Sequence, residues 1–272
     1  VSVSQINLLL DTLLASFLES GSVSWLYYSD RLNNLPLGVF AIAIGVVILP
    51  ALSGRHAADE KDSFSRTLDW AVRMVFLIAL PAALALVLLA TPLMSTIFFH
   101  GEVTAYDVGK MSLSLQAYGS GLLAFMMIKV LAPGYYARQD TKTPVKIGIQ
   151  AMVVNMVLNL ILVFPFAHAG LALATSLSAY FNVYMLYRGL RKQGVYQPQA
   201  GWWSFAGKLA LANGALAALM WWLMGPAQSW LEWSPSLRAG WMALIVVSGI
   251  ALYFSLLIAA GLRLRHLRGE VF

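Results

Sequence analysis

Cysteine is absent from this chain of 272 residues, and charged residues are scarce. Without cysteine there is no disulfide framework, no thiolate metal site and no cysteine nucleophile. Charged residues make up 11% of the chain and hydrophobic residues 60%, against about 25% and about 45–50% in ordinary soluble domains. A soluble core could not enclose this much apolar surface, so the composition predicts a protein whose solvent is the lipid bilayer.

Common catalytic motifs are also missing. The sequence contains no HExxH pair, no GxSxG nucleophile turn and no Walker phosphate loop. These absences favour a protein that is not an enzyme and does not hydrolyse ATP, so that any pumping would draw on an ion gradient, the membrane potential or a partner. The four histidines lie near predicted loops or helix ends: His56, His100, His168 and His266.

The net charge of +6 could suggest a nucleic-acid partner. The basic residues are scattered among short loops, however, and form no basic helix or stripe. We therefore predict no nucleic-acid binding. No charged leader precedes the first apolar run, which argues against a signal peptide, and we expect Val1 to lie within a longer protein.

Long apolar runs separated by polar segments predict about eight transmembrane helices. Runs such as FLIALPAALALVLLA do not alternate in polarity, as the strands of a β-barrel would. The predicted fold class is therefore all-α, a polytopic membrane protein. A Gln, Pro and Gly segment at 193–201 is the best internal boundary, because it separates six spans from a final pair. The expected spans are residues 3–20, 35–53, 68–92, 108–133, 144–164, 168–188, 204–224 and 238–261.

Lys and Arg are unevenly divided between the two predicted faces of the membrane. Positive charge is retained on the cytoplasmic side. Most of the 18 basic residues fall on one face, whereas Arg31, Lys110 and Arg238 fall on the other. We therefore predict that both ends of the chain are cytoplasmic. The crowded face includes Arg55, Lys61, Arg66, Arg73, Arg138, Lys142, Arg191, Lys192, Arg263, Arg265 and Arg268.

Asp11 is the clearest candidate for a functional group, because it lies in the middle of the first predicted span. A carboxylate at membrane depth is costly unless it faces protein, water or a counter-charge. It is either a structural group bonded to a neighbouring helix or part of a site for a cation or proton. Asn155 and Asn159 share one helix face, and Thr175 lies at a similar depth. Their oxygens are hard ligands suited to a small cation, but these side chains also serve as interhelical hydrogen-bond partners.

Arg31 is the second candidate, in the segment WLYYSDRLNNLP. It is either an interfacial arginine paired with Asp30 or a guanidinium that faces a cavity and grips a phosphate group. Lys129 could bind substrate nearer the cytoplasm, or extend its ammonium to the interface. These readings stay open from the residues alone.

The segment KVLAPGYYARQDTKTPVK connects the fourth and fifth predicted spans. Its Pro and Gly residues end one helix and begin the next. Arg138, Asp140 and Lys142 provide charges for salt bridges. A role in closing a cytoplasmic gate and a role in setting membrane orientation are equally compatible with this chemistry.

Several of these stretches together resemble the lipid II flippases of the MurJ/MviN family, within the multidrug/oligosaccharidyl-lipid/polysaccharide exporter superfamily. The specific parts are APGYYARQDTKTPVK and YYSDRL followed by GVFAIAIG and LPALS, with HAGLALATSLSAYFN further on. The resemblance covers essentially the whole chain, although the last two spans match mainly in hydropathy and placement.

The resemblance implies that the chain holds helices seven to fourteen of a fourteen-helix flippase in the bacterial inner membrane. Residues 1–192 would form the second six-helix lobe, and residues 201–272 two additional helices flanking a groove for a lipid tail. The first lobe would be a missing partner in the same protein. The complete protein would take lipid II, a cell-wall precursor, from the cytoplasmic to the periplasmic leaflet by alternating access.

The resemblance also implies roles for particular residues. Arg31 falls where a family arginine engages the lipid II headgroup. Asp11, Asn155, Asn159 and Thr175 fall where some members have a sodium site, but Asn159 stands where a second carboxylate can occur, which leaves a single formal charge. Coupling to a sodium ion or proton would be the only cofactor requirement, and membrane lipids would be further partners.

Two other functions remain as alternatives. One is an ion-coupled multidrug or polysaccharide-lipid exporter of the same superfamily, since a fold does not fix its substrate. The other is a membrane scaffold or an enzyme acting on a lipid-linked sugar. Accumulation of lipid II in depleted cells would favour the flippase, and drug sensitivity with normal growth would favour the exporter.

Overall fold

The computed structural model describes residues 2–261, apart from the side chains of residues 2–6, 8 and 40–45, and all its regular elements are helical. The predicted all-α fold is confirmed. The predicted cytoplasmic residues Arg263, Arg265 and Arg268, together with His266, lie outside the described residues. The elements are α1 (Ser2–Ser16), α2 (Ser22–Pro36), the π-helix η1 (Leu37–Ala41), α3 (Ile42–Ala57), α4 (Lys61–Leu88), α5 (Ala90–Phe98), α6 (Ala105–Leu131), α7 (Pro133–Tyr136), α8 (Lys142–Lys192), α9 (Trp202–Met224), α10 (Ser229–Glu232) and α11 (Pro235–Ala259).

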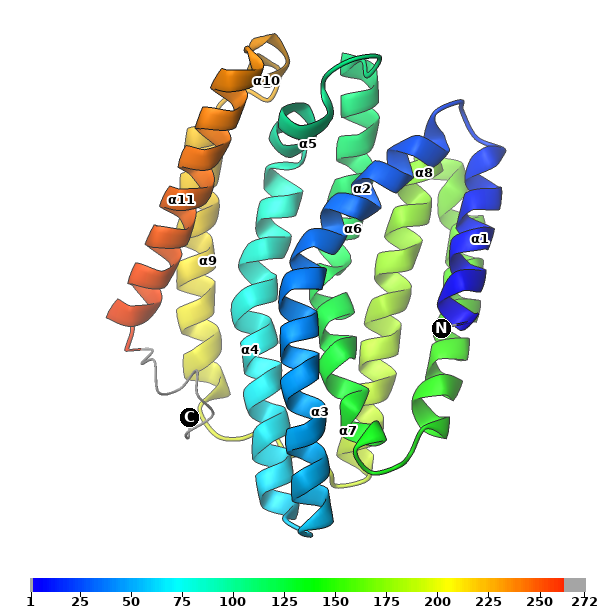
Figure 1. The fold of residues 1–272 in the computed structure, drawn as a ribbon, viewed down its shortest axis with the longest axis vertical. Helices are drawn as coiled ribbons and strands as arrows, with labels where there is room; N and C mark the ends of the chain where they lie inside the picture. Colours follow the sequence, from blue (N-terminus) through cyan, green and yellow to red (C-terminus); the bar gives the residue numbers. More distant parts are fainter. Residues whose placement is uncertain (1, 262–272) are drawn as a thin grey trace.

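Five helical stretches of the described chain are long and apolar enough to cross a bilayer. Helices α4, α9 and α11, and the α6–α7 stretch, each correspond to one predicted span. The fifth, α8, contains two predicted spans, because its backbone reverses at Ala167, where φ is 48° and ψ is −129°. Figure 1 shows the two arms of α8 running in opposite directions. We call residues 142–166 the first arm and residues 168–192 the second arm.

The segment between the first two predicted spans differs from expectation. Residues 21–34 were expected to connect two spans, but most of them form α2, which continues through η1 into α3. Its polar residues make the hydropathy of this segment too low for a predicted span. Trp25, Leu26 and Leu32 nevertheless recur at helical spacing and are buried. Arg31 therefore lies on a helix.

A bend separates α2 from α3, as Figure 1 shows. Pro36 ends α2, and the π-helix η1 follows directly. Proline lacks an N–H and its ring clashes with the preceding turn, and both effects bend a helix. The bend lets α2 and α3 point in different directions although the chain remains helical.

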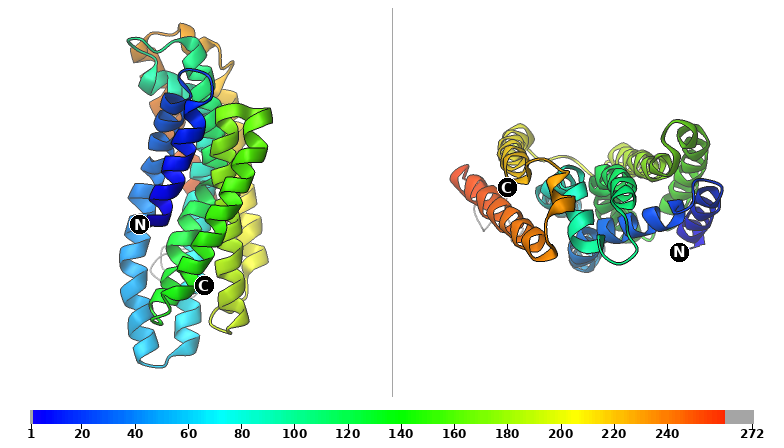
Figure 2. Two further views of the ribbon diagram at one scale, coloured as in Figure 1. Left: turned by 90° about the vertical axis from the view of Figure 1, so that its right-hand side faces the viewer. Right: turned by 90° about the horizontal axis from the view of Figure 1, so that it is seen from above.

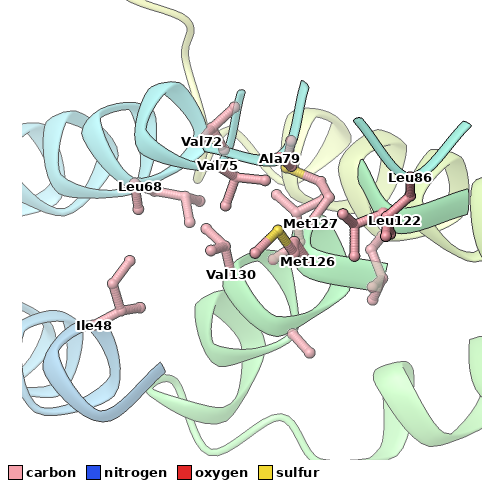
Figure 3. Packing of buried hydrophobic residues seen from close by; sticks show 14 of the residues in the cluster. Ile48, Leu68, Val72, Val75, Ala79, Leu86, Leu122, Met126, Met127 and Val130 are labelled. Atoms are coloured by element: carbon pink, nitrogen blue, oxygen red, sulfur yellow. The ribbon is translucent and has the colours of Figure 1, made fainter. Parts of the chain in front are cut away.

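The main hydrophobic core lies where α4 and α6 pack together (Figure 3). Val75 and Ala79 of α4 face Met126 and Val130 of α6, while Ile48 reaches the same cluster from α3. A second buried cluster joins α4 and α5 to α9 and α11. Helix α4 thus contributes to both clusters. The view from above in Figure 2 shows α9 and α11 at one end of the molecule and α1 at the other.

A buried polar network fixes the segment between α8 and α9. Asp69 of α4 accepts hydrogen bonds from Tyr196 Oη (2.8 Å), Trp202 Nε1 (2.9 Å) and the backbone N–H of Gln199 (3.2 Å). Its other oxygen lies 2.8 Å from Arg73 Nε, and both side chains of this ion pair are 2% exposed. The predicted boundary at 193–201 is thus a tightly bonded connection. Whether it separates two domains stays a prediction.

Candidate functional site

A cavity of about 530 Å³ lies among α1, α2, α6 and the two arms of α8. Its walls are mostly apolar, but two carboxylates face it from different helices, Asp11 from α1 and Asp30 from α2. The buried side chain of Tyr118 faces the same cavity from α6. Wet or protein-lined surroundings are what a carboxylate needs at membrane depth. The cavity is therefore the candidate site.

The four residues predicted as a cation site come together, with Asp11 and Thr175 lining the cavity and Asn155 and Asn159 buried behind them. Asn159 Nδ2 donates to Asp11 Oδ1 over 2.6 Å, and Thr175 Oγ1 lies 3.3 Å from Asp11 Oδ2. Asn155 links Asn159 to Thr175. Its Oδ1 accepts a hydrogen bond from Asn159 Nδ2 (3.2 Å), and its Nδ2 donates one to Thr175 Oγ1 (3.3 Å). We call these four residues the Asp11 cluster.

The hairpin of α8 explains why this cluster forms. Asn155 and Asn159 lie on its first arm and Thr175 on its second arm, so the reversal at Ala167 brings them side by side. Gly170 allows the arms to approach, because a Cβ there would come within 2.6 Å of the backbone carbon of Leu162. Helix α1, which lies beside α8 in Figures 1 and 2, adds Asp11.

The side chains of the cluster carry carboxylate, amide and hydroxyl oxygens. The Asn159 Oδ1 atom is buried and has no hydrogen-bond partner among the described residues. Leaving a buried acceptor unpaired costs about 1–3 kcal/mol. Carboxylate, amide and hydroxyl oxygens are the ligands that hard cations prefer, so a cation at this point would satisfy that acceptor.

Asn7 was not identified from the sequence as a site residue. It precedes Asp11 by one helical turn on α1 and lines the same cavity. Its Oδ1 atom is also buried without a partner in the described part of the chain. The spacing of four residues was the available signal, because residues i and i+4 share a helix face.

Arg31 is exposed and does not itself line the cavity, although its neighbour Asp30 does. Its guanidinium carbon is 4.9 Å from the ring centre of Tyr27, which lines the cavity. Asp30 accepts a hydrogen bond from Asn34 Nδ2 over 2.8 Å. No ion pair within 4 Å joins Asp30 to Arg31, both of which the structure describes. Arg31 is therefore held by an aromatic ring rather than by the neighbouring carboxylate.

Lys129 is not brought into the same group. It is exposed on α6, whereas its neighbour Ile128 is the residue that lines the cavity. Successive residues of a helix point about 100° apart. The structure thus places Lys129 beside the cavity wall rather than on it.

The predicted gating loop lies between α7 and α8 and forms hydrogen bonds with residues at both ends of α8. Arg138 Nη1 donates to Gln193 Oε1 over 2.7 Å, just beyond the C-terminal end of α8. Asp140 Oδ1 accepts from the Thr143 N–H over 3.0 Å in the first turn of the first arm, and this backbone hydrogen bond lowers the pKa of Asp140. Lys142 is exposed. In this loop, which the structure describes fully, these charges form no ion pair with one another within 4 Å.

Comparison with known proteins gives one consistent family. The family model described as the lipid II flippase MurJ matches residues 1–258. The chain is 51% identical over 268 residues to a probable lipid II flippase MurJ of Vibrio cholerae, covering 98% of the chain and 51% of that relative. It is 50% identical to the Haemophilus influenzae protein of the same description, covering 98% of the chain and 53% of the relative.

A solved structure described as lipid II flippase MurJ in an inward closed conformation superposes with a TM-score of 0.77. It is 25% identical, and the match covers 93% of the chain and 50% of that structure. The chain therefore spans about half the length of the relatives it matches. Family model, sequence relatives and fold agree, and the chain belongs to the lipid II flippase MurJ family.

Proposed function

We propose that this chain forms the second lobe, with two additional helices, of a flippase that moves lipid II from the cytoplasmic to the periplasmic leaflet. The observation that carries this proposal is the cavity among α1, α2, α6 and α8, which two carboxylates line in a member of this family. A first lobe would complete the cavity, and the two lobes would rock about it in alternating access. The lobes translocate their cargo without covalent chemistry, in the inner membrane and with both ends of this chain cytoplasmic.

A depletion experiment tests the function of the complete two-lobe protein. Lysis with accumulated lipid II is the expected result, because the precursor would no longer reach the outer leaflet. Normal growth with increased drug sensitivity would instead support an exporter of the same superfamily. Turnover of lipid II by the purified protein in detergent would contradict a pure carrier.

Arg31 would bind the diphosphate of lipid II at the edge of the cavity. Its planar fork matches phosphate oxygens, and Tyr27 supports the guanidinium from one side. Lys129, exposed nearer the predicted cytoplasmic side, would attract the same headgroup without lining the cavity. Arg138, Asp140 and Lys142 would belong to a cytoplasmic gate, because Arg138 and Asp140 bond to opposite ends of α8.

The variant Arg31→Ala tests the headgroup contact. We expect it to abolish complementation of a depleted strain at normal expression, whereas Arg66→Ala on the exposed surface of α4 should complement. Wild-type growth of the Arg31 variant would show that the guanidinium does not bind the cargo.

The Asp11 cluster would couple a cation to the return step. Asp11, Asn155, Asn159 and Thr175 would hold a sodium ion through oxygen atoms, or Asp11 would accept a proton. A bound cation supplies positive charge that neutralises the buried carboxylate. The unpaired Asn159 Oδ1 supports the sodium assignment.

Sodium titration of thermal stability tests this assignment, with choline chloride to match ionic strength. Sodium should raise the melting temperature of the two-lobe protein and of Asp30→Asn, which changes a cavity carboxylate outside the cluster. Asp11→Asn should lose that response. An equal response in Asp11→Asn would leave Asp11 with a structural role only.

The lipid tail would lie against α9. Two apolar grooves, of about 390 and 340 Å³, share Phe76 and Trp202, and the larger runs between α4 and α9. Leu80 and Leu209 line its two sides. A tail that already lies in the bilayer gains no transfer energy from water, so van der Waals packing against these side chains would hold an extended hydrocarbon chain in such a groove.

A further inference from the structure

A second cavity, remote from the Asp11 cluster, lies at the end of the molecule where α3 turns into α4. It measures about 340 Å³ and is lined from three separate segments, which we call together the α3–α8 pocket. The α3–α4 turn provides one wall, the loop after α7 a second and the segment after α8 a third. Its lining residues include Arg55, His56, Asp59, Glu60, Lys61 and Arg138.

Two half-buried arginines face this pocket from different segments, Arg55 from α3 and Arg138 from the loop after α7. Each guanidinium is held by one hydrogen bond: Arg55 Nη1 donates to the Ser63 carbonyl and Arg138 Nη1 to Gln193 Oε1, both over 2.7 Å. A guanidinium carries five N–H donors in a fixed fork. The two arginines are therefore oriented by protein while most of their donors remain for another group.

The carboxylates of the pocket do not neutralise these arginines. Asp59 and Glu60 also line it, but neither lies within 4 Å of either guanidinium in this fully described region. Asp59 instead lies 3.9 Å from Lys61, and both of those side chains are more than four-fifths exposed. The lining thus carries three permanent cations and two carboxylates, with the arginines as the less exposed charges.

We propose that the α3–α8 pocket binds a phosphate group, through Arg55 and Arg138 acting together. Planar guanidinium groups match phosphate oxygens in a bidentate way, which ammonium groups do not. The buried ring of Phe64 also lines the pocket, so a bound anion is partly shielded from water. Its attraction to the arginines is therefore stronger than on an open surface.

Phosphate in this pocket connects three segments that are otherwise joined by few side-chain bonds. Arg55 belongs to α3, Arg138 to the loop that follows α7, and Gln193 to the end of α8. A bound anion therefore holds the loop after α7 against the α3–α4 turn. The site is independent of the cargo proposed above, because it lies outside the cavity that contains Asp11.

The ligand has two sources, a soluble phosphate compound or the headgroup of an anionic phospholipid. The two-lobe protein in detergent is titrated with inorganic pyrophosphate, and separately placed in nanodiscs of phosphatidylglycerol or of phosphatidylcholine. Hydrogen exchange of residues 55–61, 136–141 and 193–195 is the readout. Saturable protection by pyrophosphate identifies the soluble source, and protection in phosphatidylglycerol alone identifies the lipid. Absence of protection in both overturns the proposal.

Matched variants distinguish a built site from general attraction to positive charge. Arg55→Gln with Arg138→Gln should weaken binding about tenfold or more, since each removes a charge-assisted contact. Arg66→Gln, an exposed arginine on α4 outside the pocket, should leave binding within about twofold. Equal losses in the two proteins would overturn the proposal.

A second pair of changes keeps the test informative if the double arginine variant does not fold. Asp59→Asn with Glu60→Gln removes the two carboxylates that oppose an anion, and both residues are exposed. This protein should bind pyrophosphate or the anionic headgroup several-fold more tightly, and the gain should shrink at high salt. Unchanged or weaker binding would show that the pocket does not hold an anion.

Discussion

The Asp69–Arg73 ion pair gives the sharpest prediction about stability. Its carboxylate receives four hydrogen bonds, from Arg73, Tyr196, Trp202 and the backbone N–H of Gln199. Arg73 in turn donates to the carbonyl oxygens that precede α9, and burial raises the pKa of the Tyr196 phenol, so this group remains a donor. The change Asp69→Ala would remove the common acceptor of the whole network.

The expected loss follows from burial. Both charged side chains are 2% exposed, and removing one partner of a buried ion pair costs about 3–5 kcal/mol, because the other charge is left uncompensated. In the larger two-lobe protein such a loss lowers the melting temperature by several degrees. Salt should change the difference little, since buried pairs are weakly screened.

Thermal unfolding of the two-lobe protein in detergent, followed by circular dichroism, measures this effect. The control Asp62→Ala changes an exposed aspartate in the first turn of the same helix and should cost less than about 1 kcal/mol. Paired with Arg73→Met, Asp69→Ala should be less damaging than the sum of the two single changes. A loss no larger than that of Asp62→Ala would refute the view that this network fixes α9 to α4.

Two further predictions concern packing and pH. Gly121→Ala on α6 should destabilise the protein by about 1–3 kcal/mol, since the new Cβ would lie 2.9 Å from Ser176 Cα. The control Gly109→Ala has open space around its Cβ and should be neutral or stabilising. Equal melting temperatures of the two variants would contradict the close contact at Gly121. The lowered pKa of Asp140 means that its contribution is present above the ordinary aspartate pKa and is lost as the pH falls through about 4 and below. The stability difference between wild type and Asp140→Ala should therefore shrink on acidification, and a difference independent of pH would contradict a stabilising role of the Thr143 N–H bond to Asp140.

Composition and hydrophobic periodicity predicted the helices that span the most apolar sequence. The runs that became α4, α6, α9 and α11 are long and continuous, and a bilayer leaves the backbone in them little choice but a helix. The segment at residues 21–34 escaped this reasoning because polar residues lower its hydropathy, and two of them, Ser29 and Asn33, are buried together with Trp25. Tertiary packing against α6, rather than hydropathy, makes it helical.

Candidate site residues were predictable where helical spacing could be applied. Asn155 and Asn159 share a face by their spacing of four, and the structure joins them to Asp11 and Thr175. Asn7 lies four residues before Asp11, so the same spacing places it on the cavity-facing side of α1. The α3–α8 pocket was beyond this reasoning, because its residues come from helix ends and loops far apart in sequence, and only the fold brings them together.

The bend at Pro36 divides one continuous helical stretch into two parts, α2 and α3. The second part, α3, is anchored in the core through Ile48 and Leu52, and the first part, α2, adds Trp25 and Leu32 to the same core while Asp30 lines the cavity. Asp30 and Arg31 therefore belong to a helical stretch that is anchored in the hydrophobic core. A tilt of α2 about this bend would move Arg31, and because Trp25 and Leu32 belong to the core, it would change the core packing as well.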